Sequence, residues 1–155
     1  MTRIQRFGGA HTKKKLNAVA EYLQAYVTVM KKQRFQLSYV DGFAGSGASQ
    51  SIGVEDDVLL LNDEIYETSA IVEGSPVRAL NIAPPFDRYV FVDANPENVS
   101  SLKKLSSQFP LFNIHVREGD ANLRLQEFAD FLSNEPLERA VVFLDPFGLS
   151  VRWDT

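Results

Sequence analysis

The sequence predicts an α/β fold, a Rossmann-like open and mostly parallel sheet with flanking helices. Apolar runs typical of strands alternate with helical patterns along the chain, which favours parallel pairing through crossover connections. Runs such as AVVFL at residues 140–144 are continuously apolar, as expected of strands covered on both faces. With 155 residues, 45% apolar and 23% charged, residues 1–155 are expected to form a single domain.

The first predicted element is an amphipathic helix over residues 12–31. Its apolar residues recur at spacings of three and four and share one face, namely Leu16, Val19, Ala20, Leu23, Tyr26, Val27 and Met30. A strand over residues 35–43 follows and leads directly into a glycine-containing turn. Residues 48–73 show no clear periodicity and are acidic, so we interpret them as an insertion.

Three helix–strand pairs complete the predicted domain. The first helix begins at Gly74-Ser75-Pro76, with Ser75 as its cap and Pro76 in the first helical position, and ends near residue 83. The remaining elements are a strand over 87–93, a helix over 96–108, a strand over 113–120, a helix over 122–132 and a strand over 139–145. Doubly wound domains commonly have more strands, so we expect the C-terminal part of this fold to be missing.

Composition excludes several classes of site. Without cysteine the chain has no disulfide, thiolate nucleophile or cysteine-based metal site, and a cytoplasmic location fits best. No apolar run approaches the ~20 residues that a membrane helix requires, so no membrane partner is expected. His11 and His115 stand far apart without a carboxylate-rich pattern nearby, so no metal site is predicted.

Charge is distributed unevenly along the chain. Residues 1–36 contain eight basic side chains and one acidic one, a net charge of +7, whereas the remainder has eight basic and nineteen acidic residues, a net charge of −11. A basic segment of this kind can contact phosphates or an acidic partner. The simpler interpretation, which we favour, is a solvated helix face, because nucleic-acid footprints are usually larger and contain aromatic residues.

An acidic residue stands at the end of each predicted strand: Asp41, Asp93, Asp120 and Asp145. The carboxyl ends of parallel strands meet at one edge of the sheet, where ligands of open α/β folds bind. Clustered acids are costly unless a ligand with hydroxyls, amines or positive charge meets them. The pattern therefore predicts such a ligand at this edge.

The turn DGFAGSG after the first strand does not match the phosphate-binding motifs. Gly42 and Gly47 have P-loop spacing, but Ala48 stands where that motif requires lysine. The dinucleotide fingerprint would need glycine at position 50, which is Gln50. A nucleoside ligand without a diphosphate remains: Gly45 and Gly47 would let the backbone approach it closely, and Asp41 could accept a hydrogen bond or face a cation.

The other strand ends each allow two interpretations. Asp93 suits ribose hydroxyls, or caps the helix that opens at residue 96, a role that Asn95 could also fill. Asp120 suits an exocyclic amine of a base, and equally well caps the next helix. Asp145-Pro146-Phe147 places an acceptor beside an aromatic ring, which suits a planar, amine-bearing base; alternatively it is a turn with Phe147 in the core.

The motifs DGFAGSG, VDAN, EGDAN and LDPFG together resemble those of Rossmann-like S-adenosylmethionine-dependent methyltransferases. More narrowly, the set YVDGFAGSG, EGSPVRAL, FVDAN, GDAN and FLDPFG is similar to the three-Cys-motif partner proteins. The resemblance implies that S-adenosylmethionine is the cofactor and that a three-cysteine, radical-SAM-like protein is the partner. It implies cofactor-binding roles for Asp41, Gly42, Gly45, Gly47, Asp93 and Asp120, and catalytic roles for Asp145, Pro146 and Phe147.

The motif around Asp145 departs from one methyltransferase pattern. Enzymes that methylate adenine or cytosine amines usually have Asp/Asn-Pro-Pro-aromatic, and here Phe147 replaces the second proline. DPFG is instead similar to the motif of enzymes that dimethylate a guanine amine in transfer RNA, so the resemblance allows a nucleic-acid substrate, RNA or DNA. The alternative is a non-catalytic methyltransferase-fold module that binds the three-cysteine protein. A nicotinamide oxidoreductase is disfavoured by Gln50.

Overall fold

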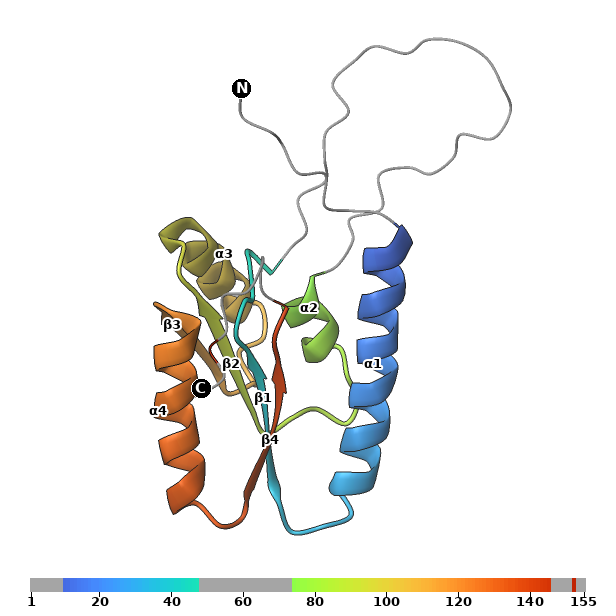
Figure 1. Ribbon diagram of the computed structural model, residues 1–155. Helices are drawn as coiled ribbons and strands as arrows, with labels where there is room; N and C mark the ends of the chain where they lie inside the picture. The colour runs from blue at the N-terminus through green and yellow to red at the C-terminus, as the bar shows by residue number, and fades with distance from the viewer. Residues whose placement is uncertain (1–9, 48–73, 146–151, 153–155) are drawn as a thin grey trace, which may run out of the picture.

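Four apolar segments of the chain form one parallel sheet. The structure, a computed structural model, describes residues 10–47, 74–145 and 152 (Figure 1). Its strands are β1 (Gln36–Asp41), β2 (Arg88–Asp93), β3 (Ile114–Glu118) and β4 (Glu138–Phe143). They pair in the order β3-β2-β1-β4, and every pairing is parallel. The predicted α/β, Rossmann-like class is therefore confirmed.

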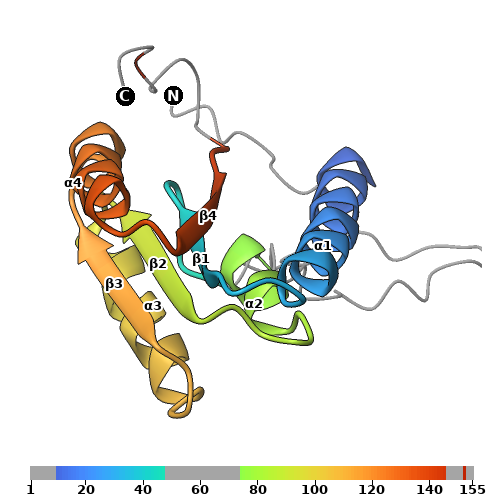
Figure 2. The ribbon, with the colours of Figure 1, turned by 90° about the horizontal axis from the view of Figure 1, so that it is seen from below.

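Helices cover the two faces of this sheet unequally. Three of them, α1 (Ala10–Met30), α2 (Ser75–Leu80) and α3 (Pro96–Ser107), contribute to the main core on one face. Helix α4 (Ala121–Asn134) packs on the opposite face, where Leu125 meets Val40, Val90 and Val92. Figure 2 shows α4 on one side of the sheet and α2 and α3 on the other.

The main core is built around aromatic side chains from β1, β2 and the segment before β2. Tyr39, Tyr89 and Phe91 are fully buried, and Phe86 is 4% exposed. The ring centroids of Tyr39 lie 5.6 Å from Phe86 and 6.4 Å from Phe91, in tilted or edge-on arrangements. Rings at such separations add ~1 kcal/mol each beyond the area that they bury. The aromatic cluster therefore anchors β1 and β2 as neighbours.

The predicted stripe of α1 faces this core. Leu16, Leu23 and Val27 are buried, and Val19, Tyr26 and Met30 pack partly buried against the same cluster. The helix begins two residues before its predicted start. The spacing of apolar residues thus predicted both the helix and its buried face.

The prediction that β4 is covered on both faces is wrong for the residues that the structure describes. β1 and β2 are almost continuously buried, as predicted. On β4, Val141 and Phe143 pack against the main core, but Val142 is 43% exposed, as is Leu144 just beyond the strand at 38%. The cause is position: β4 forms one end of the described sheet, whereas the α4 cluster covers valines of β1 and β2.

The start of α2 also differs from its prediction. The cap position is Gly74, with no side-chain hydrogen bond, and Ser75 occupies the first helical position ahead of Pro76. Ser75 does not cap the helix because its hydroxyl donates to the carboxylate of Asp41. The helix ends at Leu80, earlier than predicted, before the two prolines that a helix cannot continue into.

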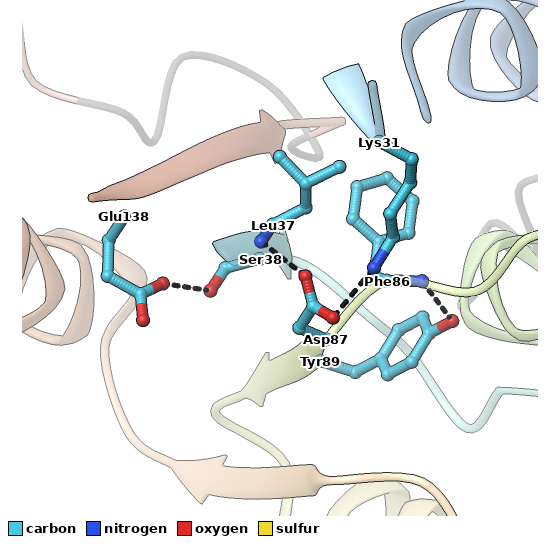
Figure 3. Close-up of polar contacts among 7 residues, drawn as sticks. All are labelled: Lys31, Leu37, Ser38, Phe86, Asp87, Tyr89 and Glu138. Carbon is cyan, nitrogen blue, oxygen red and sulfur yellow. Dashed lines mark hydrogen bonds and ion pairs between the residues drawn. The ribbon is translucent and has the colours of Figure 1, made fainter. Parts of the chain in front are cut away.

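A network of polar contacts lies near the amino ends of strands β1, β2 and β4 (Figure 3). Asp87 accepts the backbone N–H of Leu37 at 2.7 Å and the ammonium group of Lys31 at 2.6 Å. The hydroxyl of Tyr89 accepts the N–H of Phe86 at 3.0 Å, and burial raises the pKa of Tyr89 to about 12. The network ties α1, β1 and the start of β2 together, far from the edge at which the strands end.

Candidate functional site at the carboxyl edge of the sheet

The order of strands reverses beside β1. Chain order runs outward from β1 through β2 to β3, and then returns to place β4 on the other side of β1. In the pairing register Asp41 lies opposite Phe91 on β2 and Phe143 on β4. Asp93 and Asp145 therefore each follow two residues beyond the level of Asp41. Open α/β sheets bind ligands at such a reversal, outside the carboxyl ends of the strands.

The turn after β1 is hydrogen-bonded to both neighbouring strands. The N–H of Gly42 donates to the carbonyl of Phe143 at 3.0 Å, and the N–H of Ala44 donates to the carbonyl of Val92 at 2.9 Å. These bonds extend the pairing of β1 past its last residue. They hold residues 42–44 against the sheet and so fix the position from which the chain continues to Gly45 and Gly47.

The glycines of the turn are required for different reasons. Gly45 and Gly47 have φ values of +65° and +80°, in the left-handed region that glycine adopts without cost. Among the described residues, a Cβ on Gly45 would have no atom within 4 Å, so no described side chain covers this glycine. A Cβ on Gly47 would lie 2.7 Å from Leu105, and one on Gly42 would lie 2.6 Å from Leu144. Only Gly45 of the three therefore offers its backbone to a ligand; the other two make room for protein side chains.

Asp41 lies inside the protein and holds the turn together. It is fully buried, and its carboxylate accepts hydrogen bonds from the hydroxyls of Tyr39 and Ser75 and from the N–H of Phe43. Burial raises the pKa of Asp41 to about 6, against the effect of these hydrogen bonds, and the negative charge of Asp145 raises it further. Burial next to this acid also raises the pKa of Tyr39 well above its ordinary value.

Asp93 links the glycine turn to the start of α3. Its Oδ2 accepts the N–H of Gly45 at 2.9 Å, and its Oδ1 accepts the N–H of Asn95 at 2.9 Å and the amide of Asn98 at 3.1 Å. The cap of α3 is Asn95, which accepts the N–H of Glu97, so Asp93 does not fill that role. A carboxylate has about four acceptor positions. Asp93 is partly exposed, and the described residues fill only one acceptor position of its Oδ2.

Asp120 is exposed and caps α4. Its Oδ1 accepts the N–H of Leu123 at 3.2 Å, which satisfies one of the unpaired donors at the helix start. The preceding Gly119 donates its N–H to the carbonyl of Asp93 at 3.0 Å. The cap predicted for Asp120 is therefore present, and the residue is joined through Gly119 to the strand end that carries Asp93.

Asp145 meets the basic N-terminal helix. It forms an ion pair with Lys15 of α1, and the two side chains are 43% and 51% exposed. Lys31, in the turn just after α1, is paired with Asp87, so two of the basic residues of the N-terminal segment contact the acidic body of the domain. Pro146 and Phe147, and the predicted insertion at 48–73, lie outside the described residues.

The predicted residues thus form a linked edge, with partners that sequence reasoning missed. Asp93 is hydrogen-bonded to the glycine turn through the N–H of Gly45, and to the residue after β3 through the N–H of Gly119. The negative charge of Asp145 contributes to the raised pKa of Asp41. The missed partners are Lys15, Ser75 and Asn98. Asn98 was the most accessible to sequence reasoning, since it lies only five residues after Asp93, in the first turn of the predicted helix. Among the residues that the structure describes, no three His, Cys, Asp or Glu side chains form a group suited to a metal ion.

The fold and the site define the chain as an α/β protein with a Rossmann-like parallel sheet and an acidic carboxyl edge. Comparisons with protein-family models, curated proteins and solved structures found no match. In the described part of the chain no helix is both long and apolar enough to cross a membrane.

Proposed function

We propose that this chain is an S-adenosylmethionine-dependent methyltransferase domain that acts on an exocyclic amine of a nucleic-acid base. The observation that carries the proposal is the hydrogen bond from Gly45 N–H to Asp93. It joins a glycine whose Cβ position no described residue contacts to a partly exposed acid at the end of the neighbouring strand β2. A ligand seated there would meet a bare backbone and a carboxylate suited to sugar hydroxyls.

The same hydrogen bond disfavours a phosphate-bearing cofactor at this edge. Turns that bind pyrophosphate present free backbone N–H groups to it, and here the N–H of Gly45 already donates to Asp93. Asp93 adds negative charge to the edge, which disfavours phosphate and favours a cation. Asp145 would add to this charge when a ligand displaces Lys15 from it. S-adenosylmethionine carries ribose hydroxyls and a positive sulfonium and has no phosphate, so it fits the residues present.

Individual residues have separate roles in this proposal. Asp93 would accept from the ribose, Gly45 would admit the ligand to the backbone, and Asp41 and Gly47 would keep the turn in shape. The bound cofactor supplies an electrophilic methyl group. Asp145 would accept a hydrogen bond from the amine of the base and stabilise the positive charge that develops on its nitrogen. The exposed ion pair with Lys15 can exchange for the substrate, because such pairs contribute little stability.

Calorimetry of the wild-type chain and of Asp93→Asn with S-adenosylmethionine and S-adenosylhomocysteine tests the proposal. We expect the wild type to bind both, and the substitution to weaken binding about tenfold or more, because a charged hydrogen-bond acceptor is lost. Asp130→Asn is the matched control, since it makes the same change on an exposed position of α4.

Two results would contradict the cofactor assignment: absence of binding heat in the folded wild-type chain, or equal affinities for the wild type and Asp93→Asn. Circular dichroism of each variant establishes that it is folded. Tight binding of NAD in place of S-adenosylmethionine would instead support an oxidoreductase.

A second candidate function, a module that binds a three-cysteine protein, is supported by the outer face of α1. Tyr22 and Val29 are each 59% exposed, and with the exposed Ala18 and Ala25 they follow spacings of four, three and four. This is the seam spacing by which one helix packs along another. An apolar stripe on a helix whose opposite face fills the core can accept a partner helix.

The double substitution Tyr22→Lys and Val29→Lys tests this candidate. We expect it to abolish capture of a purified three-cysteine protein and to leave cofactor binding unchanged. Leu123→Lys, at an apolar position of α4 that is 57% exposed, is the matched control. Undiminished capture by the double variant would exclude α1 as the interface.

A further inference from the structure

A cavity of about 320 Å³ lies between α4 and the neighbouring strands β2 and β3, away from the carboxylates of the candidate site. We call it the α4 groove. One wall is the sheet, from which Arg88, Val90, His115 and Arg117 face the cavity. Val90 lies opposite His115 in the β2–β3 register, and Arg117 follows on the same face. The volume is within the range of sites for small ligands, ~300–1,000 Å³.

The α4 groove carries an excess of positive charge. Arg124 is paired with Glu127 at 2.8 Å, and both line the groove. Within the described part of the chain, no hydrogen bond or ion pair engages the guanidinium of Arg117. Arg88 is only partly neutralised: its Nη1 is buried, lies 3.4 Å from the carboxylate of Glu138 and forms no hydrogen bond with the described residues. A buried donor without a hydrogen bond is costly, and an anion within the groove would offset that cost.

The pKa of His115 is affected by the positive charge of the α4 groove. Partial burial lowers its pKa below the ordinary value, and the charges of Arg88 and Arg117 lower it further. The remaining charged groups of the groove, Arg124 and Glu127 on α4, form a neutral pair. His115 is therefore uncharged near neutral pH and can donate a hydrogen bond from one ring nitrogen without adding to the repulsion.

The wall formed by α4 is aromatic. Phe128 and Phe131 are partly buried, with ring centroids 5.7 Å apart. The guanidinium of Arg88 lies 4.7 Å from the ring centroid of Phe131, which holds it in place by a cation–π contact. The two rings give the groove an apolar surface beside its guanidinium groups.

We propose that the α4 groove binds a nucleotide, with the phosphate among Arg88, Arg117 and His115 and the base against Phe128 and Phe131. Guanidinium groups match phosphate oxygens in bidentate geometry, and aromatic rings stack on bases. The groove and the carboxyl edge have opposite charge, so a phosphate disfavoured at Asp93 is favoured here. The proposal does not depend on the methyltransferase assignment.

Nuclear magnetic resonance of the labelled full chain tests the proposal, because His115 is one of only two histidines. Adenosine monophosphate, adenosine and inorganic phosphate are titrated at millimolar concentration. We expect adenosine monophosphate to shift the imidazole resonances of His115 and to raise its pKa, since the phosphate opposes the arginine charges. Adenosine and inorganic phosphate should each bind more weakly. Equal affinity of either for the site, or unmoved His115 resonances, would overturn the proposal.

Two variants distinguish binding in the α4 groove from non-specific attraction to positively charged side chains. The side chain of Arg117 is exposed, so the Arg117→Gln variant should fold. We expect this substitution to weaken binding of adenosine monophosphate about tenfold. Lys103→Gln removes one positive charge from an exposed position of α3, on the opposite face, and should change nothing. An equal effect of the two substitutions would refute a built site.

A short oligoadenylate distinguishes the two sources of the phosphate. Binding tighter than that of adenosine monophosphate indicates a nucleic-acid strand, and equal or weaker binding indicates a free nucleotide. Either result supports the site. S-adenosylhomocysteine should not shift the imidazole resonances of His115. A negative result for cofactor binding at the carboxyl edge can therefore be distinguished from a negative result for nucleotide binding in the α4 groove.

Discussion

Replacing the buried carboxylate of Asp41 by an amide should change how stability depends on pH. Burial raises the pKa of Asp41 from 3.8 to about 6. The folded state therefore holds this proton more tightly than the unfolded chain does. Stability from this group is greatest below about pH 4, decreases as pH rises towards about 6, and is constant above that. At 1.36 kcal/mol for each pKa unit, the ionised carboxylate costs the folded state about 3 kcal/mol at neutral pH.

Asp41→Asn removes this titration. The amide oxygen can still accept from the N–H of Phe43, and the hydroxyls of Tyr39 and Ser75 can accept from the amide nitrogen. We expect the variant to match the wild type near pH 4 and to be more stable by up to about 3 kcal/mol at neutral pH. Urea unfolding followed by circular dichroism across this range measures the difference.

The informative quantity is the difference in the free energy of unfolding between the wild type and Asp41→Asn at each pH. His115 has a lowered pKa in the folded state, so its contribution to stability increases as pH rises, opposite to that of Asp41. It is common to both proteins and cancels. Ser75→Ala, which removes a hydrogen-bond donor from the carboxylate, should raise the pKa of Asp41 further and extend the loss of stability to higher pH. Parallel curves for the wild type and Asp41→Asn would refute the assignment of a costly buried charge.

Three further predictions concern stability and are measured by urea unfolding. Asp87→Ala should lower the free energy of unfolding by about 1–3 kcal/mol, because the N–H of Leu37 loses its acceptor; no change would contradict the role of the network. Gly47→Ala should destabilise more than Gly45→Ala, since both have positive φ but only the methyl at 47 collides with α3, and equal losses would refute this reasoning. Lys15→Met should change stability by less than about 1 kcal/mol, as expected for an exposed ion pair; a larger loss would show that the pair is structural.

Sequence reasoning identified the sheet and its edge because both depend on local pattern. β2 is one residue shorter than predicted, β1 lies within its predicted range of 35–43, and parallel pairing brings the four strand-end acids to one edge. Element ends were less predictable. Gly119, with φ +140°, and the cap at Asp120 end β3 two residues early. These features depend on backbone conformations that residue type alone does not determine.

The environment of each acid could not be predicted, because its partners are distant in sequence. Asp145 is paired with a lysine 130 positions earlier, and Asp41 with a serine 34 positions later, beyond the segment interpreted as an insertion. The α4 groove was missed for a different reason. The strand over 113–120 was predicted, but the position of His115 and Arg117 next to Arg88 depends on strand pairing and on the packing of α4.

The hydrogen bond between Gly45 and Asp93 makes two adjacent parts of the candidate ligand site, the glycine turn and the strand end, depend on one carboxylate. A ligand hydroxyl that donates to Asp93 would also change the acceptor available to the N–H of Gly45. Contacts of a ligand with the carboxylate and with the turn would therefore not contribute independently to its affinity. Two fragments of a ligand, each contacting only one of these parts, would together underestimate or overestimate the affinity of the whole, and the sign of that discrepancy would measure how the turn responds when Asp93 is engaged.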